Sequence, residues 1–316
     1  MQSALDFISW QEVINHGKFL IFKTIPLLFA ASTITFITSH LIEKIRISNF
    51  RSKRRGTAVI TGGTSGIGLE FSKLFARDKI DLVLVSNDPK EEVELVRKSL
   101  VEKFGVKVIC ESCNLSKNED RLATFDRILN QLEVKADYLV NNAGFGMVGE
   151  LQKLEWNQVN DMIQVNSTAV VHVAHAFVND AINRKSSLKM ITTSSLAGVQ
   201  PNPLFNVYAS TKAFTRLFAM ASHVELAKYN ITSTALLPGA TLTNFVKRSK
   251  YDTIGKYTSV AKLTPEEVAA CGYYHMMNGH SVAVPGLIYK FLHFLMWISP
   301  SDIMMNLFYN QNKPSQ

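Results

Sequence analysis

TAVITGGTSGIGLEFSKLFARDKIDLVLVSND, residues 57–88, is the stretch that decides the fold. The apolar and β-branched residues 57–61 predict a short buried strand, and closely spaced glycines lead from it into an amphipathic helix. The run DLVLV then predicts a second buried strand. Glycines at such a turn let the backbone approach a pyrophosphate, and the N–H groups at the helix start attract its negative charge. The stretch therefore predicts a β-turn-α-β unit that binds a nucleotide.

The same alternation continues along the chain. Helices are expected over about 89–104, 120–132, 156–183 and 206–229, and strands over 106–110, 137–140, 189–195 and 231–237. Six parallel strands with helices on both faces form an α/β fold, the doubly wound parallel sheet of the Rossmann type. We expect this domain to span residues 56–285, with an N-terminal membrane anchor and basic linker over 1–55 and an apolar C-terminal extension over 286–316.

Composition predicts a packed core, because hydrophobic residues make up 47% of the chain and charged residues only 19%. The net charge of +8 is concentrated, since residues 43–55 alone contribute +5. A local cluster of this kind is typical of a segment beside a membrane and does not predict a nucleic-acid-binding face.

The N-terminal region carries 19 residues, 24–42, without Asp, Glu, Lys or Arg, and the basic cluster follows at once. Such a run is long enough to cross a bilayer core of about 30 Å. Its late start and its length argue against a cleaved signal peptide. Pro26 and His40 keep a helix lying in the membrane interface open as the alternative to a true span. In either case the positive-inside rule places the chain after residue 43 in the cytosol.

Three cysteines are too few for a disulfide framework. Cys110 and Cys113 form a CxxC pair, but they follow a predicted strand, and no second CxxC or histidine pair stands at zinc spacing. We expect reduced structural thiols.

The stretch NVYASTKAF, residues 206–214, places Tyr208 and Lys212 one above the other on a predicted helix. A phenol with a pKa of about 10 is a poor acid or base at neutral pH. An ammonium about 5 Å away, at an effective dielectric of about 20, favours the phenolate by about 3 kcal/mol, or roughly two pKa units. The same spacing also occurs in ordinary solvated helix pairs, so the pair gains meaning from its surroundings.

Those surroundings complete a set of motifs in order: TGGTSGIG, Asn141-Asn142-Ala143-Gly144, Ser195, Tyr208-x-x-x-Lys212 and Pro238-Gly239. Together they resemble the short-chain dehydrogenase/reductase family over about residues 56–285. The chain is most similar to the membrane-associated members, the microsomal 3-oxoacyl-CoA and 17β-hydroxysteroid reductases. This resemblance implies an oxidoreductase that is anchored in a membrane, with its catalytic domain in the cytosol, at the endoplasmic reticulum.

The resemblance also implies roles for individual residues. Tyr208 exchanges a proton with the substrate oxygen, and Lys212 lowers its pKa and binds the nicotinamide ribose. Ser195, 13 residues before the tyrosine, binds the substrate carbonyl oxygen, and Ser194 is the weaker candidate. Asn166 holds a water that relays protons to the lysine. The implied cofactor contacts are Gly62, Thr64, Ser65, Gly66, Ile67, Gly68, Ser86, Asn87, Asn114, Leu115, Asn142, Ala143, Gly144, Tyr208, Lys212, Pro238, Gly239, Thr241 and Thr243. No metal is implied.

Two positions depart from the family pattern. Ser86 and Asn87 stand where relatives carry an Asp for NAD or an Arg for the 2′-phosphate of NADP, and Asp88 follows. Ser86 brings no repulsive carboxylate, which favours NADP over NAD, but no arginine adds a counter-charge. Asn114 replaces an acidic residue near the adenine, whose amino group it can still bind.

The remaining features concern partners and substrate. His172 and His175 favour helix packing or a dimer interface over a metal site, and relatives suggest a homodimer. Residues 240–263 occupy the place of a mobile substrate lid, and Thr264-Pro265-Glu266-Glu267 predicts a helix start. The following run LIYKFLHFLMWISP, residues 287–300, predicts an interfacial helix, a cover for a lipid tail or a core helix.

We therefore expect an NADPH-dependent reductase of a ketone on a hydrophobic, lipid-like small molecule. The alternatives are an NAD-dependent alcohol dehydrogenase of a lipid or steroid, and a non-catalytic nucleotide-binding membrane scaffold. An intact set of four catalytic candidates argues against the scaffold.

Overall fold

The computed structural model describes residues 25–53, 55–242 and 263–312, with side chains from 35 to 53, 55 to 242 and 263 to 310. The chain divides into two compact units, Met1–Asn49 and Phe50–Gln316. Helix α2 (Ile25–Asn49) belongs to the first unit. Within the part of the chain that the structure describes, no helix combines the length and the apolar character that crossing a membrane requires. The predicted anchor, residues 24–42, lies mostly among residues whose side chains are not described.

Over its described residues, the second unit is built on one parallel sheet of seven strands in the order β3-β2-β1-β4-β5-β6-β7. The strands are β1 (Thr57–Thr61), β2 (Asp81–Ser86), β3 (Val108–Ser112), β4 (Tyr138–Asn141), β5 (Leu188–Thr193), β6 (Ile231–Leu236) and β7 (Val282–Ala283). The order reverses between β1 and β4, and ligands of such sheets bind at the carboxyl ends of the strands beside that reversal. The doubly wound parallel sheet is confirmed. The prediction of six strands was one short, because β7 has only two residues.

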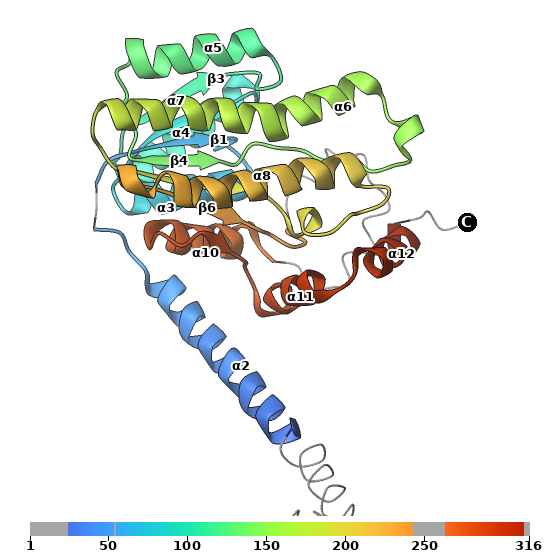
Figure 1. Ribbon diagram of the computed structural model, residues 1–316. Coiled ribbons are helices and arrows are strands. Elements are labelled where there is room, and N and C mark those ends of the chain that lie inside the picture. Colours follow the sequence, from blue (N-terminus) through green and yellow to red (C-terminus); the bar gives the residue numbers. More distant parts are fainter. Residues whose placement is uncertain (1–24, 54, 243–262, 313–316) are drawn as a thin grey trace, which may run out of the picture. The chain divides into compact units, whose positions relative to one another are not determined.

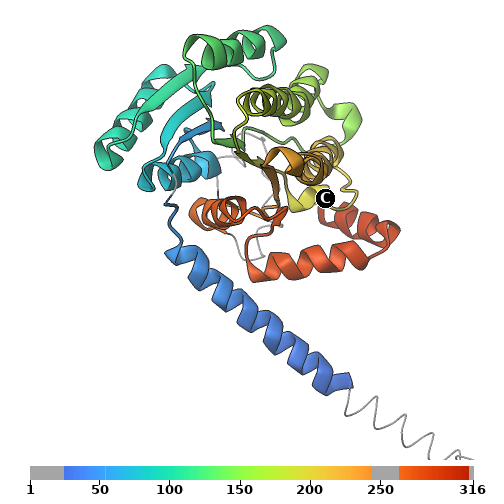
Figure 2. The ribbon, with the colours of Figure 1, turned by 60° about the vertical axis from the view of Figure 1, so that its left-hand side comes forward.

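Helices cover both faces of this sheet, as Figures 1 and 2 show. One layer contains α3 (Gly66–Arg77), α4 (Lys90–Phe104) and α10 (Pro265–Met277), and the other contains α5 (Asn118–Asp126), α6 (Trp156–Ile163), α7 (Ala169–Asn183) and α8 (Asn206–Glu225). The strands between two layers read as continuous apolar runs because both of their faces are buried. Fully buried Val83, Leu139 and Phe177 illustrate the core between the sheet and the second layer.

Helix α10 begins as the sequence predicts. The Thr264 hydroxyl accepts from the Glu267 backbone N–H at 3.2 Å, and the Glu267 carboxylate accepts from the Thr264 N–H at 3.0 Å. Pro265 occupies the first turn, where a missing N–H costs nothing. Two further helices, α11 (Leu287–Ile298) and α12 (Ser301–Asn312), follow α10.

The predicted helix over 156–183 contains a widened turn. Between α6 and α7, residues Gln164–Thr168 form a π-helical segment that carries Asn166. A second π segment, Arg127–Gln131, follows α5. Such turns are frequent at functional sites, and hydrophobic periodicity alone does not reveal them.

The linker before β1 is fixed to the second unit by Asp78 at the end of α3. This carboxylate accepts hydrogen bonds from the Ser52 backbone N–H at 2.6 Å and from the Tyr273 hydroxyl at 2.9 Å, and it pairs with Arg77 at 2.8 Å. Arg77 in turn donates to the Phe50 carbonyl at 3.1 Å. The Phe50 ring lies edge-on to the ring of Tyr273. We call these five residues the linker clamp.

The three cysteines are free thiols, as predicted, and Cys113 and Cys271 are buried. Burial raises the pKa of the Cys110 thiol to about 11, so this thiol stays protonated at neutral pH.

Candidate active site

The glycine-rich turn packs directly against the turn that follows β4. A Cβ added at Gly68 would lie 2.0 Å from the Gly62 carbonyl oxygen and 2.5 Å from Asn142 Nδ2. Only glycine fits there. Helix α3 opens at this turn, with Ser65 as an N-cap in extended conformation. A glycine cradle ahead of a helix N-terminus suits a dinucleotide pyrophosphate, so the predicted residues Gly62 to Gly68 fit the cofactor that the fold implies.

Thr61 ties the ends of β1 and β4 together. Its hydroxyl oxygen accepts from the backbone N–H groups of Asn142 and Ala143 at 3.0 and 3.1 Å. The Asn142 amide donates to the carbonyls of Thr61 and Gly62, both at 3.3 Å. These bonds give Asn142 and Ala143 a structural role that the sequence analysis did not assign, although a threonine before the first glycine of the motif was the available signal.

At the end of β2, three side chains meet in a polar cluster. Thr64 Oγ1 lies 2.8 Å from Ser86 Oγ and 2.6 Å from a carboxylate oxygen of Asp88. The Asp88 backbone N–H donates to Ser86 Oγ at 3.0 Å. Asn87, by contrast, is exposed. The sequence predicts a part in cofactor choice for Ser86 and Asn87 and none for Asp88, whose carboxylate lies beside Thr64 of the glycine-rich turn.

The turn after β3 holds two predicted cofactor contacts, Asn114, which was expected near the adenine, and Leu115. Asn114 Oδ1 accepts from the backbone N–H of Ser116 at 3.0 Å, which closes the turn. The Leu115 carbonyl accepts from buried Arg121 at 2.6 Å. Arg121 therefore holds the turn after β3 in place through this hydrogen bond.

Tyr208 and Lys212 lie one turn apart on α8, and both are buried, with 7% and 4% of their surfaces exposed. The Tyr208 ring stacks on Phe205, with ring centroids 4.3 Å apart. A side-chain hydrogen bond joins Tyr208 to Ser195. Ser194 points elsewhere, because its hydroxyl donates to the Lys212 backbone carbonyl at 2.6 Å. The preference for Ser195 over Ser194 thus agrees with the geometry.

The expected lowering of the Tyr208 pKa is wrong for this structure. Burial raises the pKa of Tyr208 to about 12, and its hydrogen bond with Ser195 offsets only part of that rise. Burial also lowers the pKa of Lys212 to about 8. The estimate from spacing placed an ammonium about 5 Å from the phenol at moderate dielectric, and it left out the cost of removing both groups from water.

Asn166 meets this pair at Gly144. The Asn166 side chain bonds both backbone groups of Phe145, donating to its carbonyl at 2.8 Å and accepting from its N–H at 3.1 Å. It also donates to the Thr211 hydroxyl at 3.1 Å. A Cβ added at Gly144 would lie 2.9 Å from Asn166 Oδ1 and 3.2 Å from Lys212 Nζ. The four predicted catalytic residues therefore gather at one place, at the carboxyl ends of β4 and β5.

The Pro238-Gly239 turn closes the site on the side of β6. The Pro238 carbonyl accepts from the Leu196 N–H at 3.0 Å, and the Thr241 hydroxyl donates to the Gly239 carbonyl at 3.0 Å. The ring of Tyr289, on α11, fills the space where a side chain at Gly239 would stand, 2.0 Å from the added Cβ. Thr243 and most of the predicted lid lie outside the described residues.

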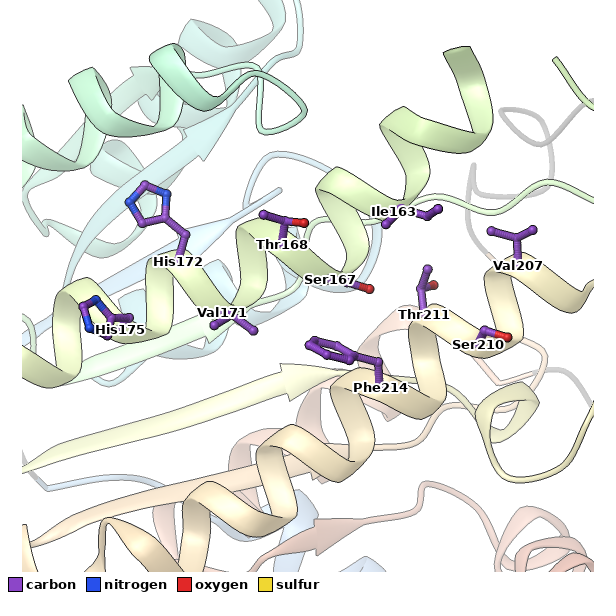
Figure 3. A pocket seen from close by; sticks show the side chains of 10 residues that line it. All are labelled: Ile163, Ser167, Thr168, Val171, His172, His175, Val207, Ser210, Thr211 and Phe214. Atoms are coloured by element: carbon purple, nitrogen blue, oxygen red, sulfur yellow. The ribbon is translucent and has the colours of Figure 1, made fainter. Parts of the chain in front are cut away.

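An open, mostly apolar groove runs between α7 and α8 on the outside of the unit, as Figure 3 shows. His172, His175 and Phe214 contribute to it, and so does Thr211, the partner of Asn166. Tyr208, Lys212 and Ser195 are not among its lining residues. The groove is therefore separate from the candidate catalytic residues.

The comparisons with known proteins agree on the family. Residues 56–253 match the model of the short chain dehydrogenase family. A very-long-chain 3-oxoacyl-CoA reductase of Anas platyrhynchos is 28% identical over 267 residues, which cover 81% of this chain and 80% of that protein. The chain spans only 58% of the reductase of the same name from Laccaria bicolor.

Two solved structures extend the likeness to three dimensions. A short-chain dehydrogenase from Sphingobium yanoikuyae, in complex with NADPH, has a TM-score of 0.68 at 24% identity, covering 83% of this chain and 98% of that one. L-Sorbose reductase from Gluconobacter frateurii, complexed with NADPH and L-sorbose, has a TM-score of 0.63 at 27% identity, covering 72% and 94%. With its matching sequence, its parallel sheet and its gathered serine, tyrosine and lysine, the chain is an oxidoreductase that belongs to the short-chain dehydrogenase/reductase family.

Proposed function

We propose that the protein reduces a ketone on a hydrophobic, lipid-like substrate with NADPH. The observation that carries this proposal is the cluster of half-buried Ser195 with buried Tyr208 and Lys212, with Asn166 held beside it across Gly144. Four polar side chains that converge next to a glycine cradle suit proton transfer at a carbonyl. A membrane scaffold that only binds nucleotide has no use for such a cluster.

In this reaction the bound dinucleotide supplies the hydride, and the protein supplies the proton and the orientation. The cradle Gly62–Gly68 would hold the pyrophosphate, and Pro238, Gly239 and Thr241 would face the nicotinamide end. Ser195 donates to the carbonyl oxygen, and Tyr208 protonates that oxygen as charge develops on it. A pKa near 12 keeps Tyr208 protonated at neutral pH, which suits the reducing direction.

Lys212 carries the positive charge of the site. With a pKa of about 8 its ammonium remains mostly protonated at pH 7. It donates to the Thr193 carbonyl at 2.8 Å, at the end of β5. From there Lys212 and Asn166 form the path by which a proton returns to Tyr208.

NADPH is favoured because Ser86 brings no carboxylate to the end of β2, and because the sorbose reductase relative was solved with NADPH. The Asp88 carboxylate beside Thr64 favours the second candidate, an NAD-dependent alcohol dehydrogenase of a lipid or steroid. A carboxylate repels a 2′-phosphate and accepts hydrogen bonds from ribose hydroxyls. A cofactor titration separates the two candidates, since clearly tighter binding of NADH than of NADPH selects the second.

The lipid-like substrate is supported by the apolar N-terminal run and by the very-long-chain 3-oxoacyl-CoA reductase relative. We place the protein at the endoplasmic reticulum, with residues 24–42 as anchor and the catalytic unit in the cytosol. Deleting residues 1–49 while keeping Phe50 and Ser52 leaves the linker clamp intact and should make the protein extractable from membranes by carbonate, since only surface docking would then hold it. Retention on carbonate-washed membranes would assign the anchor elsewhere.

A homodimer through the outer faces of α7 and α8 is the proposed assembly. Phe214, Leu217 and Val224 of α8 expose 48%, 58% and 76% of their surfaces there. Leu217→Asp should shift the molar mass in solution from dimer to monomer, whereas the exposed Leu95→Asp on α4 should not.

The direct test of the function is Tyr208→Phe. This variant should lose carbonyl-dependent oxidation of NADPH while it still binds the nucleotide, because only the transferable proton is removed. Tyr229→Phe, at a tyrosine with 43% of its surface exposed, is the matched control and should keep full activity. Undiminished turnover in Tyr208→Phe would contradict the proposed function.

A further inference from the structure

The two C-terminal helices turn apolar side chains outward. On α11, Ile288, Phe291, Leu295 and Ile298 follow one another at helical spacing, and all are exposed. Trp297 exposes 75% of its surface, the largest fraction among the large apolar side chains of the two helices. We call the full set the C-terminal apolar face: Ile288, Phe291, Phe294, Leu295, Trp297, Ile298, Ile303, Leu307 and Tyr309.

The inner side of the same helices is firmly attached to the catalytic unit. Tyr289 is buried against Gly239, with 4% of its surface exposed. The Gln200 side-chain amide donates to the carbonyls of Met296 and Ser299, and the Ser301 hydroxyl donates to Gln200 at 2.9 Å. The inner sides of α11 and α12 are thus packed against the catalytic unit, while their outer sides still expose apolar side chains. An exposed apolar face of this kind marks a surface that binds something else.

We infer that the C-terminal apolar face docks on the surface of a lipid bilayer. The exposed side chains of α11 include no acid, and Asp302 is the exposed acid of α12 among the described residues. Trp297 and Tyr309 are of the types that settle at the level of lipid headgroups, and the aliphatic side chains suit the acyl boundary beneath.

Charge complementarity supports a membrane as the occupant. Arg51 and Lys53 are exposed on the linker, beside Phe50, which packs on Tyr273 and Tyr274 of α10. Figures 1 and 2 show α10 and α11 along the same boundary of the catalytic unit. Cations there would meet the anionic headgroups of a cytosolic leaflet while the apolar face enters it. The inference rests on the proposed lipid-like substrate, which would then enter the site beside α11 without crossing water.

Tryptophan fluorescence in the full-length protein tests the inference. One variant keeps Trp297 as its only tryptophan through Trp10→Phe and Trp156→Phe. The matched control keeps Trp156 through Trp10→Phe and Trp297→Phe. Trp156 exposes 69% of its surface and begins α6. Figure 1 shows α6 apart from α11 and α12. Both proteins are reconstituted into vesicles of phosphatidylcholine and phosphatidylserine, with and without bromine on the acyl chains.

Brominated lipid should quench Trp297 at least several-fold more than Trp156. Equal quenching of the two would overturn the inference, as would quenching of Trp297 that falls when the protein concentration rises, because a protein partner would then cover the face. Adding Leu295→Asp to the Trp297 variant should abolish its excess quenching. The readout needs no turnover, so failure to oxidise NADPH with dispersed long-chain and steroid ketones would count against the proposed function and leave this result standing.

Discussion

The Lys212 ammonium lies 5.7 Å from the centre of the Tyr208 ring and donates its hydrogen bond to the Thr193 carbonyl at 2.8 Å. Burial is the largest cause of the pKa shift of both groups. The Tyr208 phenol rises to a pKa of about 12 and the Lys212 ammonium falls to about 8. Between these values the tyrosine is protonated while the lysine has lost its charge.

This separation predicts the pH dependence of the reducing direction. Tyr208 holds its proton throughout, so kcat/KM should be level up to about pH 8. Above the Lys212 pKa of about 8 the ammonium is lost and kcat/KM should fall, by roughly tenfold per pH unit. Lys212→Arg keeps the charge, so its falling limb should move upward in pH. A wild-type profile that stays level to about pH 10 would contradict a role for the ammonium.

Gly144 should not tolerate a side chain. A Cβ there would lie 2.9 Å from Asn166 Oδ1 and 3.2 Å from Lys212 Nζ, so one of the two polar groups must move. Misplacement of a catalytic group by about 1 Å costs on the order of a hundredfold in rate. We expect Gly144→Ala to lower kcat by that order while the melting temperature changes little. An unchanged kcat would show that Asn166 and Lys212 need no fixed spacing.

Asp88 should set the preference between the two nucleotides. Replacing it in Asp88→Ser removes a carboxylate beside the end of β2, where a 2′-phosphate would bring like charge. The ratio of kcat/KM for NADPH to that for NADH should rise by about tenfold, equivalent to about 1.4 kcal/mol. Glu91→Gln, in the first turn of α4, removes the same charge farther along the chain and should leave the ratio within about twofold.

The linker clamp should contribute measurably to stability. Tyr273→Phe removes a hydroxyl that donates to the buried Asp78 carboxylate, and the lost bond should lower the free energy of unfolding by about 1–3 kcal/mol. Trypsin should also cut faster after Arg51 and Lys53. Tyr274→Phe keeps the ring that packs on Phe50 and should behave like the wild type. If trypsin cuts both variants at the same rate, the linker clamp does not protect Arg51 and Lys53 from cleavage.

Much of the fold could be predicted because residues 57–88 carry local signals of strand, turn and helix that tertiary packing does not override. The shortest strand, β7, was not predicted, because its two residues, Val282 and Ala283, are too few to show a periodicity. The π-helical turn around Asn166 was not predicted either, because it leaves the spacing of apolar residues almost unchanged.

The sequence motifs name candidate site residues that the structure brings together, but they do not give the pKa values of those residues. Tyr208, Lys212, Ser195 and Asn166 follow from motifs, and the structure brings them together. The sign of the Tyr208 pKa shift did not follow, because burial is a property of the folded chain. The role of Asp88 could not be predicted for a similar reason, since its contact with Thr64 depends on how the chain turns after β2.

Tyr289 makes α11 an element with two sides, because its ring occupies the space beside Gly239 while the opposite side carries the C-terminal apolar face. Any partner that shifts α11 from outside also bears on the turn proposed to receive the nicotinamide. Thermodynamic reciprocity then requires that the two binding events alter each other's affinity by the same factor. A membrane surface would act on this enzyme as an effector, and the nucleotide would in turn regulate how tightly the enzyme holds the membrane.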